Sequence, residues 1–159
     1  MDYSDLIDPS PDDRPGDAPP DRLDALVVDD QVTLLRTWRH LLARERLTQH
    51  SLWLLLIDGH DHPLPGLVEL EGCPEEPVAG ELDSLVHMLR HLLDDLSPDG
   101  RVAVARSRPG AHPVDATDRR WAAEIQAACR RGGIHCDLVH LATPERIVPL
   151  PLDDLPATG

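Results

Sequence analysis

The chain of 159 residues contains no lysine and no phenylalanine, and it has only one tyrosine and three tryptophans. A hydrophobic core must therefore consist mainly of Leu, Val, Ile and Ala. All fifteen cationic residues are arginines, a composition that, with the abundant Ala, Pro and Asp, is typical of high-GC bacterial genomes. The formal net charge of −14 argues against nucleic acid as a partner, because phosphate binding needs a basic face. It also disfavours docking on an anionic membrane.

Long apolar runs are missing as well, since no segment approaches the roughly 20 apolar residues that span a bilayer. The first residues carry Asp where a signal peptide has cations and an apolar stretch. The three cysteines, Cys73, Cys129 and Cys136, are an odd number without close pairing, which fits free thiols in a reducing compartment. We therefore expect a cytoplasmic protein.

Acidic residues concentrate at the N-terminus, where residues 1–30 hold ten Asp against two Arg, a net charge of −8. We predict that residues 1–20 are a disordered, Pro-rich acidic leader, because such a segment buries too little apolar surface to offset its ordering entropy. Residues 21–152 then form one α/β domain, and residues 153–159 a frayed tail. The leader acts as a solvating tail or, alternatively, as an acidic arm that binds a partner or masks the domain.

Hydrophobic periodicity predicts alternating helices and strands. Apolar residues at helical spacing predict amphipathic helices over 31–47, 81–96 and 117–131. Apolar runs between turn residues predict a hairpin of two strands, followed by single strands, at 52–57, 67–70, 101–105, 134–141 and 146–148. The order α-β-β-α-β-α-β, with the last short strand added, predicts an α/β fold with a single mixed β-sheet and helices packed on it.

The stretch after the third strand carries the most specific pattern. It reads Arg106-Ser107-Arg108-Pro109-Gly110 and then Asp115-Ala116-Thr117-Asp118 at a helix start. Over roughly residues 52–148 this order resembles the JAB (JAMM) metalloprotease-like domain of RadC-type bacterial proteins. That family has H-x-H-P and S-x-x-D at these places. Its two His and the Asp hold zinc, and a hairpin Glu, here Glu69 or Glu71, is the general base.

The chain departs from the family where zinc would bind. Pro109 and Asp118 match, but Arg106 and Arg108 stand in place of the two His, Asp115 replaces Ser, and the loop is one residue shorter. Catalytic zinc needs about three protein ligands, and guanidinium groups repel a cation. The resemblance thus implies a pseudoenzyme with no catalytic residue, metal or cofactor. An Asp-x-x-Asp pattern is also an ordinary helix cap.

The two arginines suggest a binding role of their own. They lie where a strand ends before a helix N-terminus, whose N–H groups and dipole favour anions, and paired arginines can clamp a carboxylate or phosphate. We therefore predict an anion- or peptide-binding site made of Arg106, Arg108, Asp115 and Asp118. The plainer alternative is that the arginines are solvated and pair with the two Asp.

Histidines offer weaker alternatives. His60-Asp61-His62-Pro63 is an H-x-H-P within the predicted hairpin turn. A metal set of His60 and His62 with Glu69 or Asp118 competes with a simple polar turn.

His87 and His91, four residues apart, share one outward helix face, as paired metal ligands do, or are simply solvated. On the predicted strand Cys136 and His140 point to one side and His135 to the other. Cys136 and His140 would thus form a Cys–His nucleophile pair, unless Cys136 is an inert buried thiol.

Three functions compete. The first is a non-catalytic, JAB-like binding or regulatory module that recognises an unknown protein tail or acidic peptide near Arg106, Arg108 and Asp118. The second is a metal-dependent hydrolase with a non-standard ligand set. The third is a small structural subunit completed by oligomerisation. The sequence has no P-loop, dinucleotide-binding glycine pattern, G-x-S-x-G or C-x-x-C motif.

Overall fold

A computed structural model describes residues 26–151, so the predicted leader (1–20) and tail (153–159) lie outside the described residues. Within that range the chain is mixed α/β, with three helices and one five-stranded mixed sheet, as predicted. The elements are α2 (Gln31–Leu42), β1 (Ser51–Ile57), β2 (Val68–Leu70), α3 (Ala79–Leu96), β3 (Arg101–Ser107), α4 (Ala116–Arg131), β4 (His140–Ala142) and β5 (Ile147–Pro149).

The strands lie in the order β2-β1-β3-β4-β5. The predicted hairpin is confirmed, since β1 and β2 pair antiparallel. β3 also runs antiparallel to β1, and the two strands pair over their whole length, from Ser51 opposite Ser107 to Ile57 opposite Arg101. β4 is parallel to β3, to which it is connected through α4, and β5 returns antiparallel at the edge.

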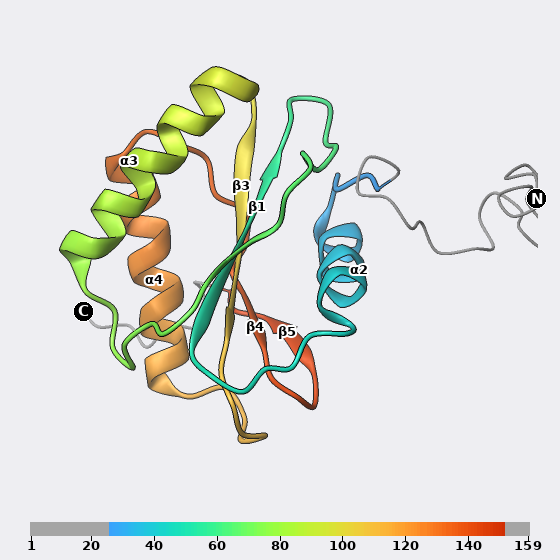
Figure 1. Cartoon of the computed structure of the whole chain (residues 1–159), viewed down its shortest axis with the longest axis vertical. Coiled ribbons are helices and arrows are strands. Elements are labelled where there is room, and N and C mark those ends of the chain that lie inside the picture. Colours follow the sequence, from blue (N-terminus) through green and yellow to red (C-terminus); the bar gives the residue numbers. More distant parts are fainter. Residues whose placement is uncertain (1–25, 152–159) are drawn as a thin grey trace, which may run out of the picture.

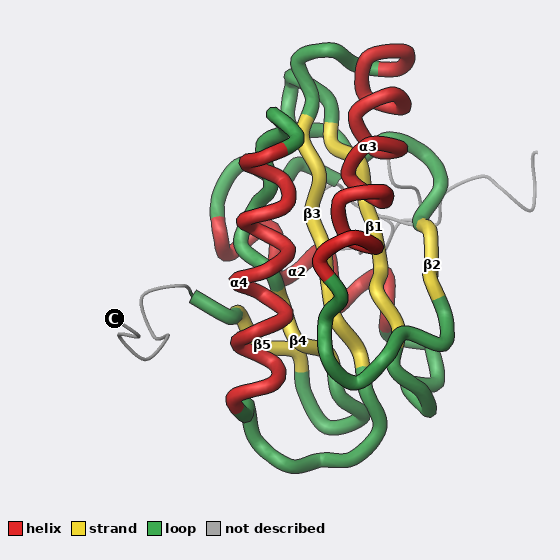
Figure 2. Tube along the Cα trace, turned by 90° about the vertical axis from the view of Figure 1, so that its left-hand side faces the viewer, coloured by secondary structure: helices red, strands yellow, loops and turns green. Residues whose placement is uncertain are grey.

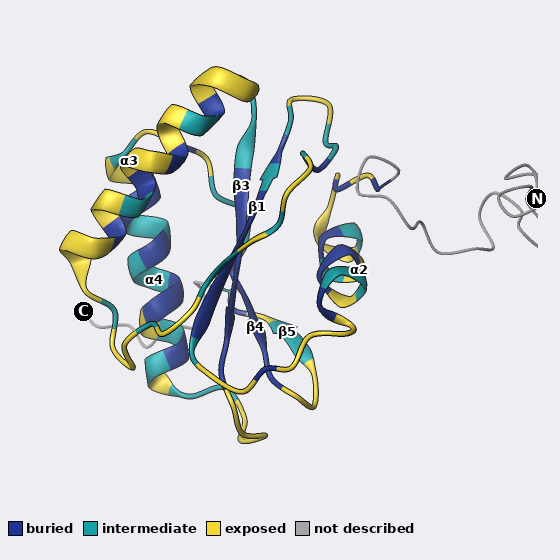
Figure 3. Cartoon of the chain, in the orientation of Figure 1, coloured by how far each residue is buried: buried dark blue, intermediate teal, exposed yellow. Residues whose placement is uncertain are grey.

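Helices cover both faces of the sheet (Figure 1). α3 and α4 lie side by side over one face, and α2 packs on the other (Figures 1 and 2). Alternate residues of β1 serve the two layers: Leu52 and Leu54 belong to the core under α3 and α4, whereas Trp53 and Leu55 belong to the core under α2. β1 and β3 are therefore buried along most of their length (Figure 3), as the continuous apolar run predicts.

The first predicted helix is too long and the third predicted strand too short. α2 ends at Leu42 instead of residue 47, because the chain turns so that Leu47 packs into the core under α2, and this tertiary packing outweighs helix propensity. β3 continues from the predicted end at residue 105 to Ser107, since each of its residues pairs with β1. Arg106 therefore lies within a strand and not in a loop.

The predicted strand over 134–141 is interrupted. Val102 pairs with Cys136, and Ala105 pairs with His140. Between these two pairs β3 spans three residue steps, whereas the segment beside it spans four. One extra residue, as in a β-bulge, reverses the alternation of side chains. Cys136 packs against the core under α3 and α4, whereas His140 shares the α2 face with its partner Ala105. The prediction that both side chains point to one side is wrong.

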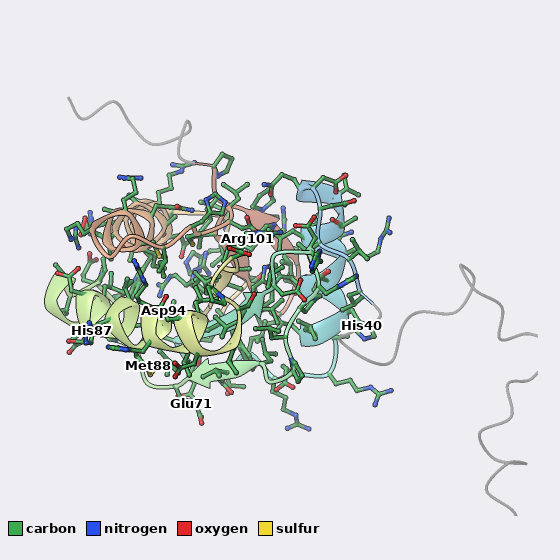
Figure 4. The ribbon with its side chains drawn as sticks, turned by 90° about the horizontal axis from the view of Figure 1, so that it is seen from above. His40, Glu71, His87, Met88, Asp94 and Arg101 are labelled. Atoms are coloured by element: carbon green, nitrogen blue, oxygen red, sulfur yellow. The ribbon has the colours of Figure 1, made fainter. Side chains whose placement is uncertain are left out.

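Arg101 ties three separate segments together at the start of β3. Its Nε donates to Asp137 at 2.8 Å, its Nη1 donates to Asp61 at 2.8 Å, and its Nη2 donates to the carbonyl oxygen of Val28. In the view of Figure 4, Arg101 lies between α2 on one side and α3 and α4 on the other. The pairing with Asp137 fixes the segment that carries the extra residue before β4.

None of the helices in residues 26–151 combines the length and the apolar character that crossing a membrane requires.

Candidate functional site

The candidate site lies at the carboxyl end of β3, where a charged side chain stands in an apolar row. Residues paired across the sheet share a face, and the row through Leu70, Leu52, Arg106 and Leu141 faces α3 and α4. Arg106 is only 1% exposed. In open α/β sheets the carboxyl ends of strands are the usual place for ligands.

Two arginines converge on one carboxylate at this position. Arg108 donates from Nε to Asp118 Oδ1 at 2.9 Å and from Nη2 to Asp118 Oδ2 at 2.8 Å, a bidentate pair. Arg106 donates from Nε to the same Oδ1 at 3.2 Å. The exposed fractions of Arg106, Arg108 and Asp118 are 1%, 2% and 0%. The expectation of solvated arginines is therefore wrong, because the carboxylate allows both guanidiniums to be buried.

Asp118 also caps the helix from which it comes. Asp115 Oδ1 accepts from the backbone N–H of Asp118 at 2.8 Å, and Asp118 Oδ2 accepts from the backbone N–H of Asp115 at 3.0 Å. This reciprocal pair is a capping box, as the Asp-x-x-Asp spacing predicts. The N-terminus of α4 is thereby already supplied with two carboxylates.

The charges of the cluster shift its ionisation. Burial opposes ionisation of Asp118, but hydrogen bonds from Arg108 and from the Asp115 backbone outweigh burial and lower the pKa of Asp118. A hydrogen bond to Asp118 raises the pKa of Arg108, while desolvation lowers the pKa of Arg106. The cluster is ionised at neutral pH, so its two buried cations face only one buried anion.

Arg106 is the less satisfied of the two arginines. Its Nη2 lies 3.4 Å from His50 Nδ1, and its guanidinium carbon lies 5.1 Å from the ring centroid of Trp121, a cation–π contact. Its Nη1 is buried, and no group in the described part of the chain is its hydrogen-bond partner. Buried donors are normally paired, so an acceptor placed beside this atom would stabilise the site.

A loop between β2 and α3 lies against this site. The backbone N–H of Cys73 donates to the carbonyl of His50 at 2.9 Å, and Trp121 Nε1 donates to the carbonyl of Glu75 at 2.7 Å. Glu76 accepts from Thr117 and pairs with Arg120 on α4. Residues 73–76 therefore contact His50 and Trp121, the two residues whose side chains lie beside the Arg106 guanidinium.

Sequence reasoning identified the two arginines and Asp118 but missed His50 and Trp121. Trp121 had a detectable signal, because it lies three residues after Asp118 and therefore on the same helix face. His50 had none, since only the pairing of Ser51 with Ser107 brings the start of β1 beside the end of β3.

The alternative metal set does not come together. His60 and His62 flank a turn in which Asp58 Oδ1 accepts from both of their backbone N–H groups, at 2.8 and 3.0 Å. Glu69 accepts a hydrogen bond from Ser51 at the other end of β1, about 20 Å away for a strand of this length. In residues 26–151 no three His, Cys, Asp or Glu side chains form a group that could hold a metal.

The proposed Cys–His nucleophile pair is wrong, because Cys136 and His140 lie on opposite faces of the sheet. The Cys136 thiol instead donates to the carbonyl oxygen of Asp137 at 3.2 Å. Its interaction with the Cys129 thiol on α4 raises the pKa of Cys136 and lowers that of Cys129. Two of the three free cysteines are therefore neighbours, which their sequence spacing did not reveal.

His140 makes the fold sensitive to acid. Burial lowers its pKa to about 4, so the folded chain binds its proton less readily than the unfolded chain does. Stability should therefore fall as the pH drops from about 6.5 towards 4. Each unit of pKa difference between the folded and the unfolded chain is worth about 1.4 kcal/mol, so the loss of stability reaches about 3 kcal/mol. Urea unfolding at several pH values should show this slope, and His140→Asn should flatten it. An unchanged slope in the variant would contradict this role of His140.

No protein-family model, curated protein or solved structure matches the chain. The function is therefore argued from the geometry of this site.

Proposed function

We propose that the chain is a non-catalytic, JAB-like binding module that takes a carboxylate or phosphate group of an acidic protein segment beside Arg106. The observation that carries the proposal is the buried Nη1 of Arg106, which has no hydrogen-bond partner among residues 26–151. A guanidinium with a spare donor, which shares its carboxylate with a second arginine, is suited to an anionic group.

Charge balance supports the same conclusion. Asp118 forms its bidentate pair with Arg108 and leaves Arg106 with a single longer contact. An uncompensated buried charge costs several kcal/mol, so an incoming anion would relieve a cost that the empty site carries. The N-terminus of α4 does not compete for that anion, because Asp115 and Asp118 already cap it.

Access to Arg106 requires residues 73–76 to move. The ion pair between Glu76 and Arg120 is about half exposed on both sides, and exposed pairs of this kind contribute at most about 1 kcal/mol. Opening the loop also breaks the hydrogen bonds of Cys73 with His50 and of Trp121 with Glu75. An acidic segment that binds the open form must offset these losses to shift the population towards it. The module would thus be closed until its partner arrives.

The likeness to JAB domains is part of this proposal. Its support is that Arg106, Arg108 and Asp118, which stand at the zinc-ligand positions of that family, converge here on one point. Guanidiniums cannot ligate zinc, so the proposal assigns the module no metal-dependent hydrolysis. We also propose a cytoplasmic location for it, in keeping with its free thiols. An oligomeric role stays a prediction that light scattering would test.

Isothermal titration of the full chain with inorganic phosphate and with a short poly-glutamate peptide tests the proposal. We expect saturable binding of at least one probe, and at least a tenfold loss of affinity in Arg106→Met. Arg130→Met is the matched control, because Arg130 is an exposed arginine in the last turn of α4. Absence of binding to both probes, or equal binding by Arg106→Met, would overturn the proposal.

A further inference from the structure

The outer face of α3 carries a pair of imidazoles that the site at Arg106 does not use. His87 and His91 are both exposed, and their Nε2 atoms lie 3.2 Å apart. Their ring centroids are 4.6 Å apart with an interplanar angle of 86°. Figure 4 shows His87 on the side of α3 that faces away from the sheet. The two nitrogens therefore converge where solvent can reach them.

This separation fits chelation of one cation. Imidazole nitrogens bind zinc at about 2.0–2.1 Å, and at that bond length two nitrogens 3.2 Å apart subtend about 100° at the metal. That angle lies between the right angles of square-planar sites and the tetrahedral angle, so both geometries are within a small adjustment. The two Nε2 atoms are hydrogen-bonded to each other, so a cation replaces this hydrogen bond and the rings turn until both lone pairs point at the ion.

The surroundings favour a cation over an anion. Asp83, Asp94 and Asp95 lie on the same helix within two turns of the pair. The two neighbouring arginines pair with two of these carboxylates, Arg90 with Asp94 at 3.4 Å and Arg131 with Asp83 at 2.8 Å, which leaves the group with a net negative charge. His87 also lines a groove of about 220 Å³ between α3 and α4, together with Asp83 and the two arginines.

Packing of α3 holds the pair in place. Four residues on the opposite side of the helix are buried in the core, namely Leu82, Val86, Leu89 and Leu93. Because the helix is already fixed, a cation does not have to order the backbone, and such preorganisation increases affinity. This distinguishes His87 and His91 from His60 and His62, whose backbone N–H groups rather than rings are held in their turn.

We propose that His87 and His91 form a two-imidazole site for one late first-row divalent cation, with water in its remaining coordination positions. Cu²⁺ binds most tightly, followed by Ni²⁺ or Zn²⁺, according to the general order of affinities for nitrogen ligands. The open positions make the bound ion exchangeable. The site is independent of the binding function at Arg106.

Isothermal titration of the untagged full chain with Zn²⁺, and with Cu²⁺ in a weakly chelating buffer, tests the site. We expect one cation per chain and tighter binding of Cu²⁺. Either His87→Gln or His91→Gln should weaken binding at least tenfold, because each change destroys the chelate. The affinity of the double variant should lie within about threefold of that of the single variants. Glutamine suits exposed helix positions, and circular dichroism verifies that the variants fold.

A double change in the hairpin turn, His60→Gln with His62→Gln, provides the matched control, since it also removes two imidazoles separated by a short spacing. This variant should bind cations as the unmodified chain does. The proposal is overturned when each α3 single variant keeps its affinity within twofold, or when binding is lost only in the hairpin variant.

Discussion

Replacing Asp118 by Asn is expected to lower the free energy of unfolding by about 3–5 kcal/mol, the usual cost of removing one partner from a buried ionic group. The carboxylate is fully buried and receives hydrogen bonds from Arg106 and from both ends of the Arg108 fork. Asparagine keeps the shape but leaves two buried guanidiniums without an anion. Its amide nitrogen also cannot accept the backbone N–H of Asp115. Urea unfolding, followed by tryptophan fluorescence, measures the loss.

Replacing Arg106 by Met is expected to change the same free energy by less than about 1 kcal/mol, because exchange of a buried charge for an apolar side chain of similar volume is often neutral or stabilising. The bidentate pair of Arg108 with Asp118 remains, and one cation then faces one anion. The unpartnered Nη1 is removed together with its desolvation cost. The contrast between Asp118→Asn and Arg106→Met separates the anchoring pair from the surplus cation.

Asp115→Asn supplies the control for burial. Its side chain is 44% exposed, and asparagine caps helices about as well as aspartate. We expect a loss below about 1 kcal/mol. If Asp115→Asn and Asp118→Asn destabilise the chain equally, the capping box and not the buried ion cluster is what Asp118 supports. If Arg106→Met costs as much as Asp118→Asn, Arg106 is an integral part of the cluster and carries no surplus charge.

The sequence predicts the layers of this fold well and its strand details poorly. The unbroken apolar run of β1 implies burial on both faces, and both cores confirm it. The apolar spacing over 81–96 likewise predicts a buried stripe, of which Leu82, Val86, Leu89 and Leu93 are buried, whereas Leu96 at its end is exposed. The interruption before β4 has no local signal, because it depends on Arg101 pairing with Asp137, 36 residues away. Hydrophobic periodicity depends on residues close together in the sequence, so it cannot predict an interaction between residues this far apart in the chain.

The candidate site shows the same division. The helix cap formed by Asp115 and Asp118 follows from residue spacing alone. Burial of Arg106 could not be predicted, because arginine is seldom buried and the prediction ended β3 two residues too early. Once β3 pairs with β1 to its last residue, Arg106 must face the core. The registry of two strands, rather than any motif, thus decides where the charge lies.

Trp38→Ala is expected to lower the free energy of unfolding by about 3–5 kcal/mol, the usual cost of truncating a buried large aromatic residue. Trp38 is fully buried and is the largest side chain that α2 contributes to the core under it. α2 contains no second tryptophan, and the chain has no phenylalanine. No other large aromatic side chain of this helix can therefore fill the cavity. Urea unfolding followed by far-ultraviolet circular dichroism measures the change without using tryptophan as the probe.

Trp38→Phe tests whether volume or the indole N–H is responsible. Within the described residues the buried Trp38 Nε1 has no hydrogen-bond partner, so phenylalanine removes an unsatisfied donor while it keeps much of the apolar contact. We expect the removal of this donor to offset part of the lost packing and to leave a net loss below about 2 kcal/mol. If Trp38→Phe costs as much as Trp38→Ala, the indole N–H has a partner that stabilises the fold. If neither change affects stability, α2 is not an integral layer of the fold, and the face of the sheet that it covers does not need its packing.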